Sequence, residues 1–400
     1  MAAQTDDRQL TPLVLGGGAV PFRRYTDGSS WRDWTRRACG DAIADAAIEP
    51  TDIDAVVVAS ESDFFSLQVA PATVLIDDIG LVPCPVMRVE SGGASGANAL
   101  RAGFMHIVSG QARRVLVVGF EQAASHLTGD TARLIYGLSF DADIEGMAGA
   151  SAVSLYALSM QEHMTVFGTT AEQLAHVSVK NHGNAKSNPL AHKPMDITVG
   201  DVLASAPASA PYRLLDCSMI SDGAAAVVLC HPQYAPSTDV LRVRIAGVGC
   251  ASDYVRLGDR AERHRFAAKQ RSAEAAYRMA GIQRPKTQID VAEVYDAFTG
   301  AELQGIEALG LCDDGRAGPA VAAGEFGKDG RLPVNLSGGL IGQGGAPGAT
   351  GVMQALSMQR LLSGRYWPEL QPQKDLRRGL IDAHGGICTV SVTHILERVG

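Results

Sequence analysis

The segment at residues 87–110 reads MRVESGGASGANALRAGFMHIVSG, and a related segment, PVNLSGGLIGQGGAPGATGVMQALSMQRLLSG, returns at residues 333–364. Each passes from a strand-like run through Ser-Gly-Gly and Gly-Ala-Ser/Thr-Gly into an amphipathic helix that closes in Ser-Gly. Such an internal repeat indicates a molecule built from two similar halves. We expect two helix N-termini, after Gly96 and Gly351, to meet at a pseudo-twofold axis. Their unpaired N–H groups would stabilise an oxyanion; the alternative is that these glycines only permit close helix–sheet packing.

Short apolar runs alternate with helical stretches on either side of both repeats. Strands are expected at residues 13–16, 53–59, 86–89, 114–119, 222–229, 241–251, 290–295, 333–336, 380–383 and 389–396. Helices are expected at residues 31–47, 95–109, 261–279, 299–309 and 350–362. This alternation predicts an α/β protein with a mostly parallel sheet. Residues 236–239 look like a linker between an N-terminal half, 1–234, and a C-terminal half, 240–400.

The region from about residue 120 to 213 has a different character. It mixes helical pieces with polar, Gly- and Pro-bearing segments, and it holds five of the ten histidines. We interpret it as a large insertion in the first half, lying over the first core.

Composition excludes several functional classes. The 400 residues are 46% hydrophobic and 20% charged, which is enough for two domain-sized cores. The net charge of -8, without a basic run, argues against nucleic acid. No apolar stretch approaches the roughly 20 residues of a membrane span, and the polar first twelve residues argue against a secretory signal. Seven scattered cysteines without a CxxC pair fit reduced thiols and no structural metal, so we expect a cytoplasmic protein.

Four spaced motifs resemble those of the thiolase superfamily. The family's Cys-Ala-Ser-Gly, His/Asn-(Asp/Glu)-Ala-Phe, Asn-x-x-Gly-Gly and Gly-His-Pro-x-Gly-Ala-Thr-Gly correspond to residues 93–96, 295–298, 335–339 and 344–351. Residues 215–229 and 393–398 also look like archaeal-type and sterol-carrier-type members. The resemblance covers nearly the whole chain. It implies a thiolase fold with two similar βαβαβαββ halves in five αβαβα layers, a loop insertion in the first half, and an acyl-CoA substrate.

The departures from the family's motifs affect its chemistry directly. Gly93 stands where a thiolase keeps its nucleophilic cysteine, and it has no side chain that could form an acyl-enzyme. Gly345 replaces the histidine of Gly-His-Pro. The late cysteine of many thiolases would fall near Ala383 or His384, and Cys388 is offset from that place. The usual ping-pong acyl transfer is therefore not supported by these residues.

Tyr295 occupies the place where relatives have Asn or His beside the thioester. A phenol both donates and accepts hydrogen bonds, and we expect an electropositive pocket between helix N-termini to lower its pKa. Tyr295 would then take the proton of a β-hydroxyl in a retro-aldol cleavage. A Cys-less branch of the superfamily, which includes steroid side-chain aldolases, carries a tyrosine in a similar position. It also carries a second tyrosine near Gly-His-Pro, which this chain lacks. The alternative role for Tyr295 is that of a core residue.

Several further residues are candidates for the site. His384 is a second acid–base candidate, with a structural histidine as its alternative. The resemblance places Gly93, Gly345, Asn335 and Gly386 around the thioester. Lys180, Lys186, Lys193 and Arg213 fall in the insertion, where relatives bind the CoA phosphates, although solvated surface charges are an equal alternative.

The resemblance leaves three functions open. They are a Cys-independent lyase of the aldolase type, an acyltransferase or condensing enzyme, and a catalytically silent subunit that binds acyl-CoA. Coenzyme A would enter as part of the substrate and not as a permanently bound cofactor. The expected assemblies are a homodimer, or a heterodimer with a thiolase homologue, with a small OB-fold and zinc-ribbon protein as a further candidate partner. The sequence names neither the acyl group nor the pathway.

Overall fold

A computed structural model describes residues 11–399 of the chain. Within them, nine strands form one sheet in the order β3-β2-β4-β7-β1-β8-β11-β10-β9, and β5 and β6 form a separate pair. The strands are β1 (Leu13–Ala19), β2 (Ala55–Ala59), β3 (Val86–Val89), β4 (Arg114–Gln122), β5 (Pro207–Ser209), β6 (Tyr212–Arg213), β7 (Asp222–Cys230), β8 (Arg242–Ser252), β9 (Val291–Glu293), β10 (Arg378–Gly385) and β11 (Val390–Val399).

The α-helices alternate with these strands and account for most of the remaining regular structure. They are α1 (Trp31–Asp45), α2 (Asp63–Ser66), α3 (Pro71–Asp78), α4 (Ser95–Val108), α5 (Gly129–Gly137), α6 (Ala152–Phe167), α7 (Ala171–Ala185), α8 (Val199–Ala204), α9 (Ala267–Ala280), α10 (Pro285–Gln288), α11 (Thr299–Ala308), α12 (Ala317–Ala322), α13 (Gly339–Gly342) and α14 (Pro347–Leu362). In the part of the chain that the structure describes, no helix is long and apolar enough to cross a membrane.

The sheet order shows the duplication directly. In the first half, β2 is parallel to β3 and β4, and β7 and β1 follow as antiparallel strands. In the second half, β9 is parallel to β10, and β11 and β8 follow as antiparallel strands. A parallel bridge from Ala292 to Val334 repeats the β2–β3 pairing. The two halves meet where Leu13 pairs with Arg244 and Val14 with Val243. The predicted α/β fold of two similar halves is confirmed, but the expectation of a mostly parallel sheet was wrong. Apart from β2–β3, β2–β4 and β9–β10, the neighbouring strands of the sheet pair antiparallel.

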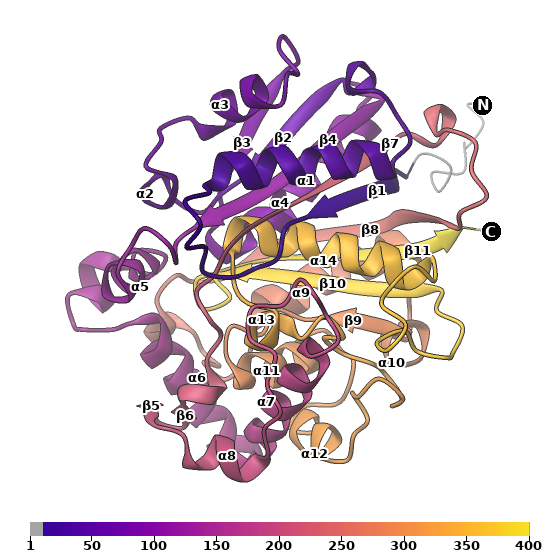
Figure 1. Ribbon diagram of the computed structural model, residues 1–400. Helices are drawn as coiled ribbons and strands as arrows, with labels where there is room; N and C mark the ends of the chain where they lie inside the picture. The colour runs from indigo at the N-terminus through magenta and orange to yellow at the C-terminus, as the bar shows by residue number, and fades with distance from the viewer. Residues whose placement is uncertain (1–10, 400) are drawn as a thin grey trace.

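Helices α4 and α14 form the central layer of the molecule. Helix α14 contacts β4 and β7 of the first half and β10 of the second, and it packs against α4 (Figure 1). Helix α1 covers β1 and β7 from outside, and α9 covers β8 and β11. The strands of each half form one layer of the continuous sheet, and α4 and α14 lie between these two layers. The order of layers is therefore helix, sheet, helix, sheet, helix, as the resemblance implied.

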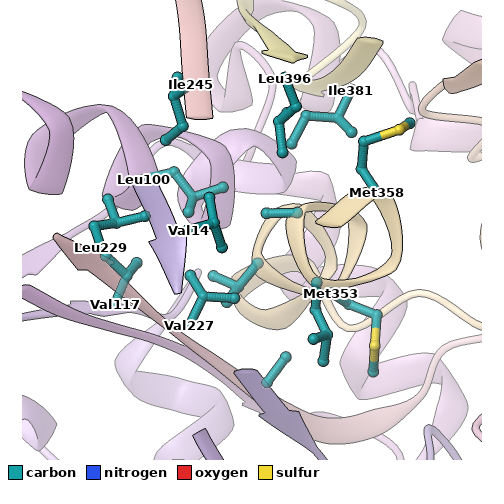
Figure 2. Packing of buried hydrophobic residues seen from close by; sticks show 14 of the residues in the cluster. Val14, Leu100, Val117, Val227, Leu229, Ile245, Met353, Met358, Ile381 and Leu396 are labelled. Carbon is teal, nitrogen blue, oxygen red and sulfur yellow. The ribbon is translucent and has the colours of Figure 1, made fainter. Parts of the chain in front are cut away.

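The central layer is held by apolar side chains from both halves. Figure 2 shows this cluster, to which the first half contributes Val14, Leu100, Val117, Val227 and Leu229, and the second half Ile245, Met353, Met358, Ile381 and Leu396. These side chains are almost completely buried. Removing them from water is the main favourable term that holds the two halves together.

The insertion between β4 and β7 exists as predicted, but its expected position over the first core was wrong. Helix α7 packs on α11, α12 and α13, and α6 contacts α11. Leu155 and Val177 of the insertion share a hydrophobic cluster with Leu303 and Ile306 of the second half. Apolar periodicity shows which face of a helix is buried, but not which partner buries it.

One strand is longer than the sequence suggested. The run of glycines at residues 16–18 continues β1 instead of ending it. A Cβ at Gly18 would lie 2.5 Å from the carbonyl oxygen of Ala38, so α1 can approach β1 only if this residue is glycine.

Candidate functional site

Gly93, in the Ser-Gly-Gly turn of the first repeat, meets Tyr295 of the second half. Gly93 lies in a short 3-10 turn just before α4, and Tyr295 follows β9. A Cβ on Gly93 would lie under 3.0 Å from the Tyr295 hydroxyl oxygen and 2.5 Å from the carbonyl oxygen of His384. Real Cβ atoms essentially never come so close to other atoms. The phenol hydroxyl therefore fills the space that a nucleophilic side chain at position 93 would need.

The ring of Tyr295 is firmly held while its hydroxyl is not. The residue is 5% exposed and belongs to a small apolar cluster with Ala94, Leu340 and Ala383. Its backbone N–H donates to Asp382 over 3.2 Å. Within residues 11–399, its hydroxyl makes no hydrogen bond. The hydroxyl is thus fixed in place and available to a ligand.

The expectation of a lowered Tyr295 pKa was wrong. Burial raises the pKa of this phenol well above its usual value, and the negative charges of Glu61, Asp296, Asp382 and Glu121 raise it further. Burial and these acidic groups therefore outweigh the turn at the start of α4, which also lies beside the hydroxyl. Tyr295 is therefore a neutral hydrogen-bond donor at neutral pH.

His384 lies beside Tyr295, with 4.7 Å between the ring centroids. Its Nε2 is 2.6 Å from the hydroxyl of Tyr156, and that hydroxyl lies 2.8 Å from the carbonyl oxygen of Gly386. Because the Tyr156 proton is donated to this carbonyl, we assign the imidazole proton to Nε2. Nδ1 then carries a lone pair, and it has no partner in the described part of the chain. Burial, together with the charges of Lys269 and Arg260, lowers the His384 pKa, so the ring is neutral.

Two carboxylic acids that the sequence motifs did not reveal, Glu61 and Glu121, lie beside this pair. Glu121 Oε2 accepts the backbone N–H groups of Glu61, over 2.9 Å, and of Gly348, over 3.0 Å. Ser139 donates its hydroxyl to Glu61 Oε1 over 2.8 Å. Glu61 Oε2 and Glu121 Oε1 are buried without a partner among the described residues. Burial raises the pKa of Glu61 to about 7 and that of Glu121 well above its usual range.

A signal for these carboxylates was present in the sequence. Glu61 comes just after the expected strand at residues 53–59, and Glu121 just after the one at 114–119. The carboxyl ends of neighbouring parallel strands meet at one edge of a sheet, where α/β proteins bind ligands. Tyr136, from the insertion, adds a third polar group. Its hydroxyl is buried and unpartnered in the described structure, and burial and the charge of Glu61 raise its pKa.

A cavity of about 400 Å³ opens beside these groups. Among the residues that line it are Glu61, Glu90, Gly92, Ser139 and Gly386. Glu61 Oε1 lies 3.6 Å, and the Gly386 nitrogen 3.7 Å, from the position of a Cβ on Gly92. The N–H groups of Gly93 and Gly386 donate to no acceptor within residues 11–399. The cavity thus combines the free amide of Gly386 with a carboxylic acid, and the free amide of Gly93 follows its lining residue Gly92. This arrangement suits a carbonyl compound that develops negative charge.

Of the predicted pocket residues, Gly386 lines this cavity, Gly93 directly follows the lining residue Gly92, and Gly345 and Asn335 lie elsewhere. Gly345 is separated from Tyr295 by Leu340, whose Cδ2 is 3.7 Å from the position of a Gly345 Cβ. Its backbone pairs with the segment at residues 219–221. The Asn335 amide accepts from the Val294 N–H over 2.7 Å and donates to Glu302 over 2.7 Å. Asn335 therefore has a structural role, because its polar atoms are used inside the protein.

The basic residues of the insertion also lie away from the cavity. Lys180 is buried, with its amine 2.9 Å from the Val334 carbonyl oxygen and 3.0 Å from Glu302. This expectation of a phosphate ligand was wrong, since a buried ammonium needs these partners. The other three basic residues contact groups close to them. Lys186 pairs with Asp196, Lys193 donates to the Met219 sulfur, and Arg213 donates to the Ser205 carbonyl oxygen.

The repeated glycines serve packing, so the oxyanion role proposed for the two helix N-termini is not supported. A Cβ on Gly96 would lie 2.7 Å from the Gly348 carbonyl oxygen, and one on Gly351 under 3.0 Å from the Ala97 nitrogen. The N–H of Gly348 is already bound by Glu121. The sequence repeats therefore located the crossing of α4 and α14 and, in Gly93, one of the two free amide donors of the site, but not that of Gly386.

Cys388 does not replace the missing nucleophile. Cys388 is fully buried in a hydrophobic cluster, and burial raises its thiol pKa to about 11. A thiol of this kind is a poor nucleophile. No group of three His, Cys, Asp or Glu residues suited to a metal ion occurs within residues 11–399.

Comparisons with known proteins agree with this architecture. The family model "Thiolase, N-terminal domain" matches residues 19–198, and "Thiolase C-terminal domain-like" matches residues 249–398. The acetyl-CoA acetyltransferase of Methanothermobacter thermautotrophicus is 37% identical over 96% of this chain and 99% of its own. Sterol carrier protein 2 of Oryctolagus cuniculus is 28% identical over 89% of this chain and 68% of its own.

Solved structures show the same likeness in three dimensions. The structure of the "Ltp2-ChsH2(DUF35) aldolase" superposes with a TM-score of 0.81 and 25% identity, covering 97% of this chain and 98% of that one. The acetyl-CoA acetyltransferase from Syntrophomonas wolfei has a TM-score of 0.71 and 18% identity, covering 98% of this chain and 100% of its own.

Proposed function

This chain belongs to the thiolase family, and on that premise we propose that it cleaves a carbon–carbon bond of an acyl-CoA thioester without a nucleophilic cysteine. The reaction is a retro-aldol cleavage of a β-hydroxyacyl-CoA. The observation that carries the proposal is the Tyr295 hydroxyl in the space beside Gly93, where an acyl-enzyme would otherwise form.

A retro-aldol cleavage suits the groups in this site. The β-hydroxyl loses its proton, the bond between Cα and Cβ breaks, and its electron pair moves toward the thioester oxygen to form an enolate. The products are a ketone or aldehyde and, after Cα is protonated, a shortened acyl-CoA. As a neutral phenol, Tyr295 donates a hydrogen bond to the enolate oxygen, and the free N–H groups of Gly93 and Gly386 assist it. The proton acceptor is then a different group, for which Glu61 and His384 are the two candidates.

The relatives support two of the three functions that the sequence left open. One structural relative is named an aldolase, and it covers nearly the whole chain. Sequence relatives named acetyl-CoA acetyltransferase favour acyl transfer as the second candidate. Acyl transfer by the usual route needs a nucleophile that Gly93 cannot supply and that the buried thiol of Cys388 supplies poorly. The cleavage reaction therefore fits the site better.

One experiment separates these functions. The purified protein is incubated with panels of β-hydroxyacyl-CoA and β-ketoacyl-CoA thioesters, and products and protein adducts are followed by mass spectrometry. We expect a carbonyl product and a shortened acyl-CoA from at least one β-hydroxyacyl-CoA, with no acylated residue. Stoichiometric acylation of a cysteine with turnover would establish the transferase. Binding without any product would establish the silent subunit.

Tyr295→Phe tests the role of the hydroxyl. The variant keeps the ring and its apolar contacts, so it should fold and bind acyl-CoA about as well as the wild type. Loss of an oxyanion donor typically costs about 10²–10³ in kcat, and steady-state kinetics should show a decrease of this size. Cys388→Ala is the control and should leave cleavage nearly unchanged. Retention of cleavage by Tyr295→Phe within about threefold, far short of the range for a lost donor, would remove Tyr295 from the mechanism.

We also propose that the chain assembles with other proteins. The aldolase among its structural relatives is named as a pair, Ltp2 with ChsH2(DUF35). By analogy, this chain would form a homodimer or a heterodimer with a thiolase homologue, together with a small OB-fold and zinc-ribbon protein. Affinity purification from the native cell, followed by mass spectrometry and light scattering, tests this. Full activity of the isolated homodimer would argue that no further partner is needed.

A further inference from the structure

Glu61 has the position of a group that acts on a ligand. It follows β2 and lines the cavity, with its Oε1 beside Gly92, the residue before Gly93. The next residue, Gly93, abuts the Tyr295 hydroxyl, so the carboxyl and the phenol lie against successive residues of one turn. A substrate that reaches the Tyr295 hydroxyl through this cavity would therefore lie beside Glu61.

The two oxygens of Glu61 are in different environments. Oε1 accepts the Ser139 hydroxyl over 2.8 Å, which fixes the orientation of the carboxyl. Oε2 is buried and has no partner within residues 11–399. A buried, unpartnered carboxyl oxygen costs free energy unless a ligand satisfies it. The unpaired oxygen is therefore the atom at which a hydroxyl from the substrate would bind.

The backbone of Glu61 is fixed by a second carboxylic acid. Glu121 accepts the Glu61 N–H and the Gly348 N–H with one oxygen, and so ties the end of β2 to the start of α14. A general base must be held within hydrogen-bond reach of the proton that it removes. This tie and the Ser139 contact hold Glu61 from two sides.

His384, the other candidate base, is less suited to the role. Its ring is completely buried, and like Tyr295 it is not among the residues that line the cavity, whereas Glu61 is. The positive charges of Lys269 and Arg260 make it harder to protonate. A base whose conjugate acid is disfavoured in this way accepts a proton poorly. Glu61 faces Glu90, Glu121, Tyr136 and Tyr295, and burial together with the charge of Glu90 favours its protonated form.

We propose that Glu61 is the catalytic base that accepts the β-hydroxyl proton of the substrate on its free Oε2. This inference rests on the proposed cleavage and adds a residue to it. The O–H proton moves to Glu61, the alkoxide becomes a carbonyl, and the bond between Cα and Cβ breaks. Its electron pair forms the enolate that Tyr295 stabilises. Protonated Glu61 then returns its proton to Cα, directly or through water, so the carboxylate is restored and no oxidant or reductant is consumed.

The test compares the wild type with Glu61→Gln, Glu61→Asp and Glu293→Gln. Glu293 is a matched control, because it is a buried glutamate whose pKa is also raised to about 7, yet both of its oxygens are bound by Ser337. With the best-cleaved substrate of the panel, Glu61→Gln should lose about 10²–10⁴ in kcat. The fall in kcat/KM below about pH 7 should disappear with it. Glu61→Asp should keep this pH dependence at a reduced rate, and Glu293→Gln should behave like the wild type.

A binding measurement keeps the assignment testable whether or not cleavage is found. Calorimetry compares 3-hydroxybutanoyl-CoA with butanoyl-CoA, which lacks the β-hydroxyl. The wild type and Glu293→Gln should prefer the hydroxylated ligand, and Glu61→Gln should lose most of that preference. Cleavage by Glu61→Gln within about threefold of the wild type, far short of the loss expected for a base, would overturn the role of Glu61. If the wild type cleaves nothing, the proposed function fails. An equal ligand preference in the wild type and Glu61→Gln would then overturn the Glu61 contact as well.

Discussion

At the scale of single residues, the phenol of Tyr295 is possible only because position 93 is glycine. A side chain at position 93 and a phenol at position 295 would compete for the same space. A relative with a cysteine at the first position therefore needs a smaller residue than tyrosine at the second. In this chain the loss of the nucleophile and the presence of the phenol are one structural feature, which converts a site for covalent chemistry into a site for hydrogen bonding.

Gly93→Ala should expose this competition. The added methyl would push against the Tyr295 hydroxyl and the His384 carbonyl, and overpacking of this kind typically costs about 1–3 kcal/mol. Urea unfolding should show a lower free energy of unfolding. In the Tyr295→Phe background the cost should be smaller, because the nearest atom is gone, so the two changes should not be additive. Additive costs would mean that the methyl and the hydroxyl do not meet.

Glu61 should also make the stability of the protein depend on pH. Burial raises its folded-state pKa from the ordinary value of 4.5 to about 7. Its contribution to stability is therefore complete below pH 4.5 and is lost as the pH rises through about 7. Glu61→Gln removes this loss, so the variant should gain stability relative to the wild type between about pH 5 and pH 8, by at most about 3 kcal/mol. Urea unfolding of the wild type and the variant at these two pH values measures the gain. If the stability difference between the two proteins does not change with pH, the burial of the Glu61 charge is contradicted.

The sequence predicted part of this site and missed the rest for physical reasons. Motif resemblance located Gly93, Tyr295 and His384, which the structure brings together. The Tyr295 pKa is raised first by burial and then by nearby negative charges, and both depend on residues distant in sequence, such as Glu61 and Glu121, as well as on local ones. Asn335 and Lys180 carry suitable groups, but their polar atoms are used by buried partners that no local pattern reveals.

At the scale of elements, the crossing of α4 and α14 depends on glycine. Gly351→Ala would place a methyl against the backbone of Gly96 and Ala97, which cannot move aside as a side chain does. We expect this variant to lose about 1–3 kcal/mol of stability or more. Gly183→Ala, in the exposed part of α7 where nothing lies within 4 Å of the new methyl, is the matched control and should gain about 0.5–1 kcal/mol. Thermal unfolding measures both, and a neutral Gly351→Ala would mean that the helices do not touch there.

The helices and strands themselves were largely predictable, and their contacts were not. Expected elements such as residues 95–109 and 299–309 agree with α4 and α11 to within one residue, because apolar periodicity and glycine boundaries are local. The placement of α6 and α7 is a long-range choice between two apolar surfaces. Their contact with α11 brings the insertion to the second half and places Tyr156 against His384.

At the scale of the whole molecule, the two halves share one core and one site. Helix α14 of the second half packs on β4 and β7 of the first, while α7 of the first half packs on α11 and α13 of the second. Tyr295 and His384 come from the second half, and Gly93 and Glu61 from the first. Each half of the described chain therefore leaves an apolar face that the other half covers.

The halves should consequently fold only together. A chain split between Ser237 and Thr238, in the connection between β7 and β8, would give two fragments, each with one face of the central layer exposed. Exposed apolar surface of this extent favours aggregation, so each fragment alone should be insoluble or lack a cooperative unfolding transition. Fragments expressed together should assemble, because the contacts across the α4–α14 layer and from β1 to β8 need no covalent connection. Circular dichroism, thermal unfolding and cleavage of the best β-hydroxyacyl-CoA measure this. A single fragment that unfolds cooperatively would show that the halves are independent domains, and the shared core would then contribute to the site but not to folding.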